Sequence, residues 1–267
     1  MICFPNAKIN LGLHVTGKQS DGFHTIETIF YPIPLRDALE AVESDKTSFT
    51  QTGMNLKTTP EENLVMKAYA LMSKFHKAPM LAIFLKKAIP SGAGLGGGSA
   101  DAAFMLKLID ELSNCPISES RLLELAGLLG SDCPFFIRNT PVIATGTGNI
   151  FHPTDVSLKG YNLYIVKPPF DVSTKEAYAM VKPQKPPFSL EKLSAIPVRE
   201  WKHVLFNDFE SCVFSKYPYI QELKEKLYAM GAVYASMSGS GSAVFGLFEK
   251  TVSSNFSNCF VWKGILP

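Results

Sequence analysis

A run of small residues from Pro90 to Ala103, P-S-G-A-G-L-G-G-G-S-A-D-A-A, is the feature that most constrains this chain. Five of the seven residues 92–98 are glycine. Glycine lets backbone N–H groups converge on a polyanion, at a cost in backbone entropy that an ordinary turn need not spend. After the run, apolar residues recur at the spacing of a buried helical stripe: Ala102, Met105, Leu106, Ile109 and Leu112. The run therefore leads into a helix N-terminus, which favours a bound phosphate, most simply that of a nucleotide. The alternative is a tight strand-to-helix turn without a ligand.

Other phosphate-binding loops fit this run less well. Gly92, Gly94 and Gly97 match the dinucleotide fingerprint formally, but Pro90 separates them from the strand expected at Met80–Leu85. No Gly-Lys-Ser/Thr closes a Walker A loop, and no His-Arg-Asp or Asp-Phe-Gly marks a protein kinase. An oxidoreductase with a Rossmann domain stays open as an outside alternative.

Composition favours an ordinary globular protein over the other broad classes. The 267 residues are 46% hydrophobic and 19% charged, and the net charge of +2 indicates neither a general nucleic-acid binder nor a membrane binder. The longest apolar run is far too short to span a bilayer, and the N-terminus does not resemble a secretory signal. Five scattered cysteines predict reduced thiols in a cytoplasmic protein, and the dispersed histidines form no zinc pattern.

Apolar and polar residues alternate over residues 7–14, which predicts a strand with one apolar face and one polar face. The polar face carries Lys8 and Asn10. A turn at residues 17–22 and a second strand at 23–31 follow. Helices are expected at 63–74, after the glycine run, from Ser118 or Glu119 to Gly130, and around 220–231. Further strands are expected at 80–85, 142–144, 161–166 and 243–248. A shift in composition at 151–160 predicts a boundary between domains 1–155 and 156–267.

Three segments together are more specific than any one of them: Pro5-Asn-Ala-Lys-Ile-Asn10, the glycine run, and Ser238-Gly-Ser-Gly-Ser242. This pattern resembles that of the GHMP kinases, which phosphorylate small molecules with ATP. The resemblance spans nearly the whole chain, and four further segments narrow it to a branch whose substrate carries a cytidine diphosphate group: Lys8–Leu11, Asp21–Thr25, Leu129–Phe135 and Phe206–Glu210.

The resemblance implies an α+β fold of two domains with the active site in the cleft between them. The N-terminal, ATP-binding domain would contain a left-handed βαβ unit, and the C-terminal domain would be ferredoxin-like. The implied reaction phosphorylates the 2-hydroxyl of a methylerythritol unit in the non-mevalonate route to isoprenoid precursors. Another GHMP kinase with a different alcohol, and a catalytically silent relative, are the alternatives; neither a nucleic acid nor an obligate protein partner is implied.

The family pattern assigns catalysis to Lys8 and Asp132. Asp132 would act as the general base toward the hydroxyl, while Lys8 would keep it ionised and offset charge on the transferred phosphoryl group. Taken without the resemblance, Lys8 is a solvated strand lysine and Asp132 is a turn residue beside Pro134.

On the acceptor side, the resemblance places Phe23 against one face of the cytosine and Tyr178 against the other, with His24 hydrogen-bonding to the base. Tyr178 is otherwise a core aromatic. Phe23 replaces a tyrosine that is common in the family, so the stacking surface remains without the hydroxyl. The remaining implied substrate contacts are Asn10, Thr174, Gly239, Ser240 and Gly241.

On the ATP side, the resemblance implies that the backbone of the glycine run cradles the phosphates. The residues are Pro90, Ser91, Gly92, Ala93, Gly94, Leu95, Gly96, Gly97, Gly98, Ser99 and Ala100. Ser99 would also reach the Mg²⁺ that arrives with ATP. Asn63 and Leu64 match positions of the family's adenine pocket, although the sequence around Asn63 also predicts a helix N-cap there. Lys87 would lie over the nucleotide or, alternatively, in solvent.

Overall fold

The computed structural model describes residues 1–54, 59–75, 78–113, 116–253 and 255–267. Its backbone forms two compact units that are discontinuous in sequence. Unit 1 consists of Met1–Ala7, Leu35–Ser91 and Gly96–Thr140, and unit 2 consists of Lys8–Pro34, Gly92–Leu95 and Pro141–Pro267. The chain thus changes unit twice within the glycine run, between Ser91 and Gly92 and again between Leu95 and Gly96.

Unit 1 contains a four-stranded sheet in the order β1-β4-β6-β5. The strands are β1 (Ile2–Cys3), β4 (Ala38–Glu43), β5 (Ser48–Gly53) and β6 (Leu81–Lys87). β6 pairs antiparallel with β4 and parallel with β5, so β5, α1 (Leu64–Phe75) and β6 form the expected βαβ unit. The sheet is mixed, which argues against the doubly wound parallel sheet of a Rossmann domain.

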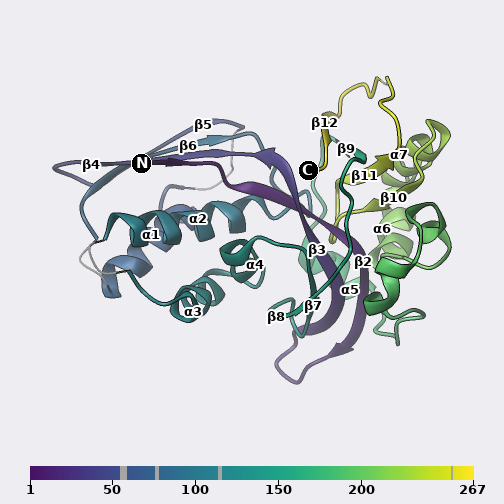
Figure 1. Cartoon of the computed structure of the whole chain (residues 1–267), viewed down its shortest axis with the longest axis horizontal. Helices are drawn as coiled ribbons and strands as arrows, with labels where there is room; N and C mark the ends of the chain where they lie inside the picture. Colours follow the sequence, from purple (N-terminus) through teal and green to yellow (C-terminus); the bar gives the residue numbers. More distant parts are fainter. Residues whose placement is uncertain (55–58, 76–77, 114–115, 254) are drawn as a thin grey trace. The chain divides into compact units, whose positions relative to one another are not determined.

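Helices complete the described part of unit 1, and Figure 1 shows α1 and α2 (Gly97–Leu112) on the same side of this sheet. Alternate residues of β6 are buried, among them Leu81, Ile83 and Leu85, as expected of a strand with one covered face. α3 (Glu119–Leu129) begins after Ser118, whose side chain accepts a hydrogen bond from Arg121 N, and it ends before Gly130, as predicted. The short helix α4 (Cys133–Arg138) was not predicted.

Unit 2 contains two sheets. The first has the order β2-β3-β7-β8, with β2 (Asn6–Lys18), β3 (His24–Arg36), β7 (Val142–Thr145) and β8 (Ile150–Pro153). The second has the order β10-β11-β9-β12, with β9 (Asn162–Lys167), β10 (Tyr234–Met237), β11 (Val244–Phe248) and β12 (Phe260–Ile265). Neighbouring strands of the second sheet are antiparallel. Read from β12 to β10, the sheet holds the fourth, first, third and second of its strands along the chain, which is the strand order of a ferredoxin-like sheet.

Helices pack against this second sheet, as the green segments of Figure 1 show for α6 (Phe209–Lys216) and α7 (Pro218–Ala229). The other helical segments of unit 2 are α5 (Thr174–Met180) and the 3-10 helices η1 (Leu190–Ala195) and η2 (Val198–His203). α7 buries Ile220, Leu223 and Leu227 in the core and ends before Gly231, as predicted.

The grouping into units differs from the contiguous division at residue 155. Leu13, Val15 and Ile26 of the first hairpin belong to the same core cluster as Val166 of β9 and Leu223 of α7. Burial of these apolar side chains ties β2 and β3 to the C-terminal half of the chain. Local composition carries no signal for such a long-range association.

Candidate functional site

The strand β2 presents its polar residues to the interior. Lys8 is 3% exposed and Asn10 is 2% exposed, so the reading of Lys8 as a solvated lysine is wrong. Lys8 Nζ donates a hydrogen bond of 2.6 Å to Asn10 Oδ1 and lies 4.8 Å from the centre of the Phe30 ring. Asn10 Nδ2 in turn donates to Thr28 Oγ1 over 3.0 Å. An ammonium group held in this way has a fixed direction and a low solvent exposure, both of which strengthen its electrostatic effect.

The first half of the glycine run, Gly92–Leu95, is a turn with left-handed φ angles at Gly92 and Gly94, and backbone hydrogen bonds fix it in unit 2. Lys8 N donates to Leu95 O over 2.9 Å, while Ser242 N and Ala243 N donate to Gly92 O and Ala93 O. A Cβ added to Gly94 would overlap the carbonyl oxygen of Ser238, and Gly94 has φ +71°. Gly94 is therefore required by the packing of the third motif on the first half of the run.

The second half of the run begins α2 in unit 1. Gly96, with φ +71°, occupies the N-cap position, and Gly97, Gly98 and Ser99 form the first turn. N–H groups of a first turn have no acceptor within their own helix, so they can bind an anion. A Cβ on Gly98 would meet only Leu64 Cδ1, at 3.6 Å. The backbone at Gly98 is therefore accessible, and Leu64 lies beside it.

The flanks of the run are anchored by apolar side chains. Side chains of four residues are buried, whereas Ser91 is exposed; the buried ones are Pro90, Ala93, Leu95 and Ala100.

Asn63 lies just before α1, and its Oδ1 accepts a hydrogen bond of 2.9 Å from Val65 N. Its predicted N-cap role is therefore confirmed, and its Nδ2 points to Gln51 Oε1 at 3.5 Å.

Lys87 is not the solvated lysine of the alternative reading. It is 3% exposed at the end of β6, and its ammonium contacts the carboxylates of Asp37 and Asp101. The two carboxylates raise the pKa of Lys87 against the opposing effect of burial. Burial raises the pKa of Asp101 to about 7. The nearby Gly97 would place a Cβ 3.3 Å from Lys87 Nζ, so this cluster lies directly beneath the first turn of α2.

Asp132 occupies the N-cap position of α4 and is half-buried. The next residue, Cys133, is buried at the start of the helix, and its thiol interacts with Ser99 of α2. Burial is the main cause that raises the pKa of both Cys133 and Cys3 to about 12, so neither thiol is a ready nucleophile at neutral pH. Asp132 and Ser99 are thus presented by neighbouring helix N-termini of unit 1.

The residues expected at the cytosine lie together in unit 2. The ring of Phe23 is 61% exposed, while the His24 ring stacks on Tyr178 with centroids 4.9 Å apart. Tyr178 is half-buried and also meets the Phe209 ring edge-on, so it is partly a core residue, as the alternative reading held. Burial, and to a lesser degree the charge of Lys18, lower the pKa of His24. A neutral imidazole, which can both donate and accept, is therefore favoured at neutral pH.

The third motif forms a buried hairpin between β10 and β11. Ser238 Oγ accepts from Asn10 N at 3.3 Å and donates to Gly94 O at 2.9 Å, so one hydroxyl joins all three sequence motifs. Ser240 Oγ lies 3.0 Å from Oγ1 of Thr174, the first residue of α5. Gly239 and Gly241 have φ +57° and +88°. Thr174 and the loop Ser238–Gly241 therefore belong to one structure.

Several polar residues of these sites were missed by sequence reasoning, namely Asp37, Asp101, Thr28 and Asn207. Each acts through a partner distant in sequence, so periodicity and local spacing carry no signal for it. Asp101 lies within the glycine run, and Asn207 lies within Phe206–Glu210, one of the segments that carry the family resemblance. Neither position in the sequence indicated the contact with Lys87 or with the third motif.

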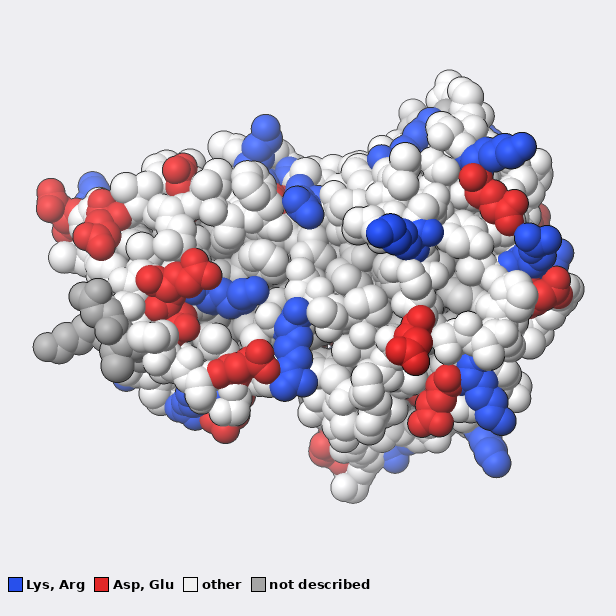
Figure 2. Space-filling view, viewed as in Figure 1, with Lys and Arg blue, Asp and Glu red and all other residues white. Residues whose placement is uncertain are grey.

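Charge on the surface adds little to this description. The face in Figure 2 carries Lys and Arg side chains interspersed with Asp and Glu. Among the described residues, no group of three or more His, Cys, Asp or Glu side chains is arranged to hold a metal ion, and no helix is long and apolar enough to cross a membrane.

The comparisons with known proteins agree with these features. Residues 63–139 match the model for the GHMP kinases N terminal domain, and residues 190–259 match that for GHMP kinases C terminal. The chain is 58% identical to 4-diphosphocytidyl-2-C-methyl-D-erythritol kinase of Parabacteroides distasonis over 100% of both chains. It is 53% identical to the enzyme of the same name from Bacteroides fragilis, over 98% of each.

Solved structures give the same result. A crystal structure of 4-(cytidine 5'-diphospho)-2C-methyl-D-erythritol kinase superposes with a TM-score of 0.81 at 32% identity, covering 93% of this chain and 90% of that one. Streptococcus pneumoniae phosphomevalonate kinase, in complex with phosphomevalonate and AMPPNP, shares the fold with a TM-score of 0.66 at 15% identity, over 94% and 93% of the two chains. The chain belongs to the GHMP kinase family and, within it, to the 4-diphosphocytidyl-2-C-methyl-D-erythritol kinases.

Proposed function

We propose that this protein transfers the γ-phosphoryl group of ATP to the 2-hydroxyl of 4-diphosphocytidyl-2-C-methyl-D-erythritol. The observation that carries the proposal is the full-length identity of 58% to a relative of that name, together with buried Lys8 on β2 and an accessible glycine-rich N-terminus of α2. The first identifies the substrate class, and the other two supply the charge and the phosphate site that the chemistry needs.

In the proposed reaction, the substrate hydroxyl oxygen attacks the γ-phosphorus, and the bond from that phosphorus to the β,γ-bridging oxygen breaks. Asp132 accepts the hydroxyl proton, and ADP leaves with the electron pair of the broken bond. The Lys8 ammonium, held by Asn10, offsets the negative charge that spreads over the transferred group.

ATP is bound at the start of α2 in this proposal. Backbone N–H groups of Gly97, Gly98 and Ser99 face the phosphates, and Asn63 and Leu64 line the adenine. Lys87 has the supporting role that its two carboxylate partners dictate: it fixes the first turn of α2 and contributes less charge to the nucleotide than a lysine without such partners. The residues present fit a magnesium ion carried in by the phosphates, because the first turn of α2, where the phosphates would lie, also carries the Ser99 hydroxyl. Mg²⁺ would neutralise phosphate charge during transfer.

The cytidine group is read by the exposed ring of Phe23 and by His24, with Tyr178 as the second aromatic surface. Cytosine offers an exocyclic amine donor and a ring-nitrogen acceptor, and a neutral imidazole can pair with either. Thr174 and the loop Gly239–Gly241 lie on the same unit and contact the remainder of the substrate.

The proposal is tested by incubating the purified protein with ATP, Mg²⁺ and the cytidine-diphosphate-linked alcohol. The expected products are ADP and an alcohol that shows one new phosphomonoester signal in the phosphorus NMR spectrum, and removal of Mg²⁺ with EDTA stops turnover. ADP release with homoserine or mevalonate in place of this alcohol would assign the protein to another GHMP reaction. Ligand binding without ADP release from any alcohol would identify a silent relative.

A further inference from the structure

The segment Asn207–Glu210 has no part in the proposed reaction, although its motif distinguishes this branch of the family. It lies at the start of α6, and its residues reach several elements of unit 2. The Asp208 carboxylate accepts a hydrogen bond of 2.9 Å from Val15 N and lies 3.2 Å from His14 Nδ1, both on β2. The Phe209 ring meets Tyr178 with centroids 4.8 Å apart. The segment therefore contacts both the strand of Lys8 and one of the aromatic residues proposed for the base.

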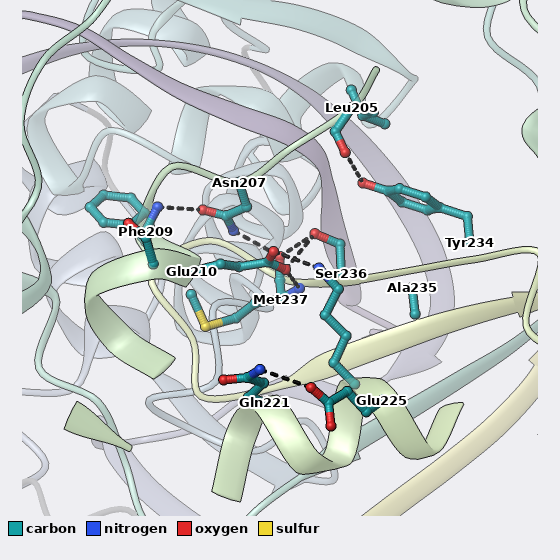
Figure 3. Close-up of polar contacts among 12 residues, drawn as sticks. Leu205, Asn207, Phe209, Glu210, Gln221, Glu225, Tyr234, Ala235, Ser236 and Met237 are labelled. Atoms are coloured by element: carbon teal, nitrogen blue, oxygen red, sulfur yellow. Dashed lines mark hydrogen bonds and ion pairs between the residues drawn. The ribbon is translucent and has the colours of Figure 1, made fainter. Parts of the chain in front are cut away.

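Asn207 connects this segment to the end of β10 and to the third motif, and Figure 3 shows it between Phe209 and Met237. Its side chain is buried at 4% exposure, and Nδ2 donates hydrogen bonds of 2.8 Å to Met237 O and to Gly239 O. Its Oδ1 accepts from Phe209 N over 3.0 Å. Both amide protons and the amide oxygen are thus used, and the two carbonyl groups lie on either side of Ser238.

Glu210 fixes the end of β10, just before the same loop, by accepting hydrogen bonds from Ser236 and Met237. Its Oε1 accepts hydrogen bonds from Met237 N at 2.8 Å and from Ser236 Oγ at 3.1 Å, contacts that Figure 3 also draws. Lys224 Nζ holds its second oxygen at 2.6 Å. Met237 is therefore held at both its N–H and its C=O group, whereas Gly239 is held at its carbonyl by Asn207.

The loop needs such a holding group because of its composition. Gly239 and Gly241 have left-handed φ angles, and glycine admits many other backbone conformations at little cost. We propose that Asn207 is a positioning residue, which orients the loop Ser238–Gly241 so that its backbone contacts the substrate. This inference rests on the proposed function for the identity of the substrate, but the orientation of the loop can be measured without it.

The test is Asn207→Asp, which preserves the size of the side chain and the acceptor for Phe209 N. It removes both donors and places a carboxylate against two carbonyl oxygens. The amides of Gly239–Ser242 are expected to exchange with deuterium at least tenfold faster, while those of α7 keep the rate of the parent. The KM for the cytidine-linked substrate is expected to rise at least tenfold, with kcat reduced less than threefold.

Asp208→Asn is the matched control, because it replaces a carboxylate by an amide at the next residue, which contacts β2 and not the loop. Its loop amides are expected to exchange as in the parent. Asn207→Ser, which is smaller and uncharged, replaces Asn207→Asp if that variant does not fold, and the same direction of change is expected. The inference would be overturned if a folded Asn207 variant kept the loop exchange and the KM of the parent. It would also be overturned if Asp208→Asn accelerated exchange of the loop amides as much as Asn207→Asp does. A parent protein without turnover would refute the proposed function alone, since the exchange measurement still decides the role of Asn207.

Discussion

At the scale of single residues, two buried lysines have different tasks. Lys87 contacts two carboxylates, so its charge is balanced within unit 1 and serves to join β6 to α2. Lys8 donates a hydrogen bond to the amide oxygen of Asn10 and lies over the Phe30 ring, and in the proposed reaction its ammonium faces the transferred phosphoryl group. The same residue type, equally buried, thus serves structure in one place and supports the proposed chemistry in the other.

Replacement of the proposed base gives the first prediction. Asp132→Asn is expected to lower kcat by about 10²-fold or more, because loss of a general base costs 10²–10⁴-fold, while the Kd for ATP changes little. Single-turnover rates and calorimetric ATP binding measure the two effects. Glu119→Gln is the control on an exposed carboxylate that pairs with Arg138, and it is expected to leave kcat unchanged. A single-turnover rate of Asp132→Asn within a few-fold of the parent would leave Asp132 as the turn residue of the alternative interpretation.

The base-reading residues give the second prediction. Uracil reverses the donor and acceptor pattern of cytosine, and each unsatisfied buried polar group costs about 1–3 kcal/mol. The parent is therefore expected to use a uridine-linked analogue at least tenfold less efficiently. His24→Ala should weaken binding and flatten that preference, whereas Phe23→Ala should weaken the binding of both analogues. The measurement is kcat/KM for each pair, and equal use of both bases by the parent would remove His24 from base recognition.

At the scale of elements, the glycine run divides into two halves with different reasons for glycine. Gly94 makes room for the carbonyl of Ser238, while Gly98 has open space around it. Gly98→Ala is expected to keep or raise the melting temperature, since alanine in a helix is favoured over glycine by about 0.5–1 kcal/mol, yet to weaken ATP binding at least tenfold. Gly94→Ala is expected to lower the melting temperature first. Calorimetry and thermal unfolding of both variants separate these effects, and unchanged ATP affinity in Gly98→Ala would show that phosphate does not approach this turn.

The cluster beneath α2 gives a prediction about stability. Lys87→Met leaves two buried carboxylates without their cation, and such a loss destabilises by about 3–5 kcal/mol. Adding Asp101→Asn to that variant removes one carboxylate and is expected to restore part of the stability. Denaturant unfolding of the parent and both variants measures the difference. If Lys87→Met were as stable as the parent, the cluster would not join β6 to α2.

At the scale of the whole molecule, the sequence predicts the elements better than their association. Local signals such as Asn63 before α1, Ser118 before α3 and Gly231 after α7 located helix ends correctly, because capping depends on neighbouring residues. The inclusion of the first hairpin in unit 2 depends on packing partners more than a hundred residues away, such as Val166 and Leu223. The proposed site residues come from the family resemblance and stay a prediction, whereas the contacts of supporting residues such as Asn207 required coordinates.

The central claim is that the chain phosphorylates an alcohol that it recognises through a cytidine diphosphate group. The most direct measurement is kcat/KM from ADP release with Mg²⁺-ATP, compared between the cytidine-diphosphate-linked substrate and methylerythritol phosphate, which lacks the cytidine group. The account predicts turnover with the linked substrate and at least a hundredfold lower kcat/KM without the cytidine group. Equal efficiency with both acceptors would contradict it.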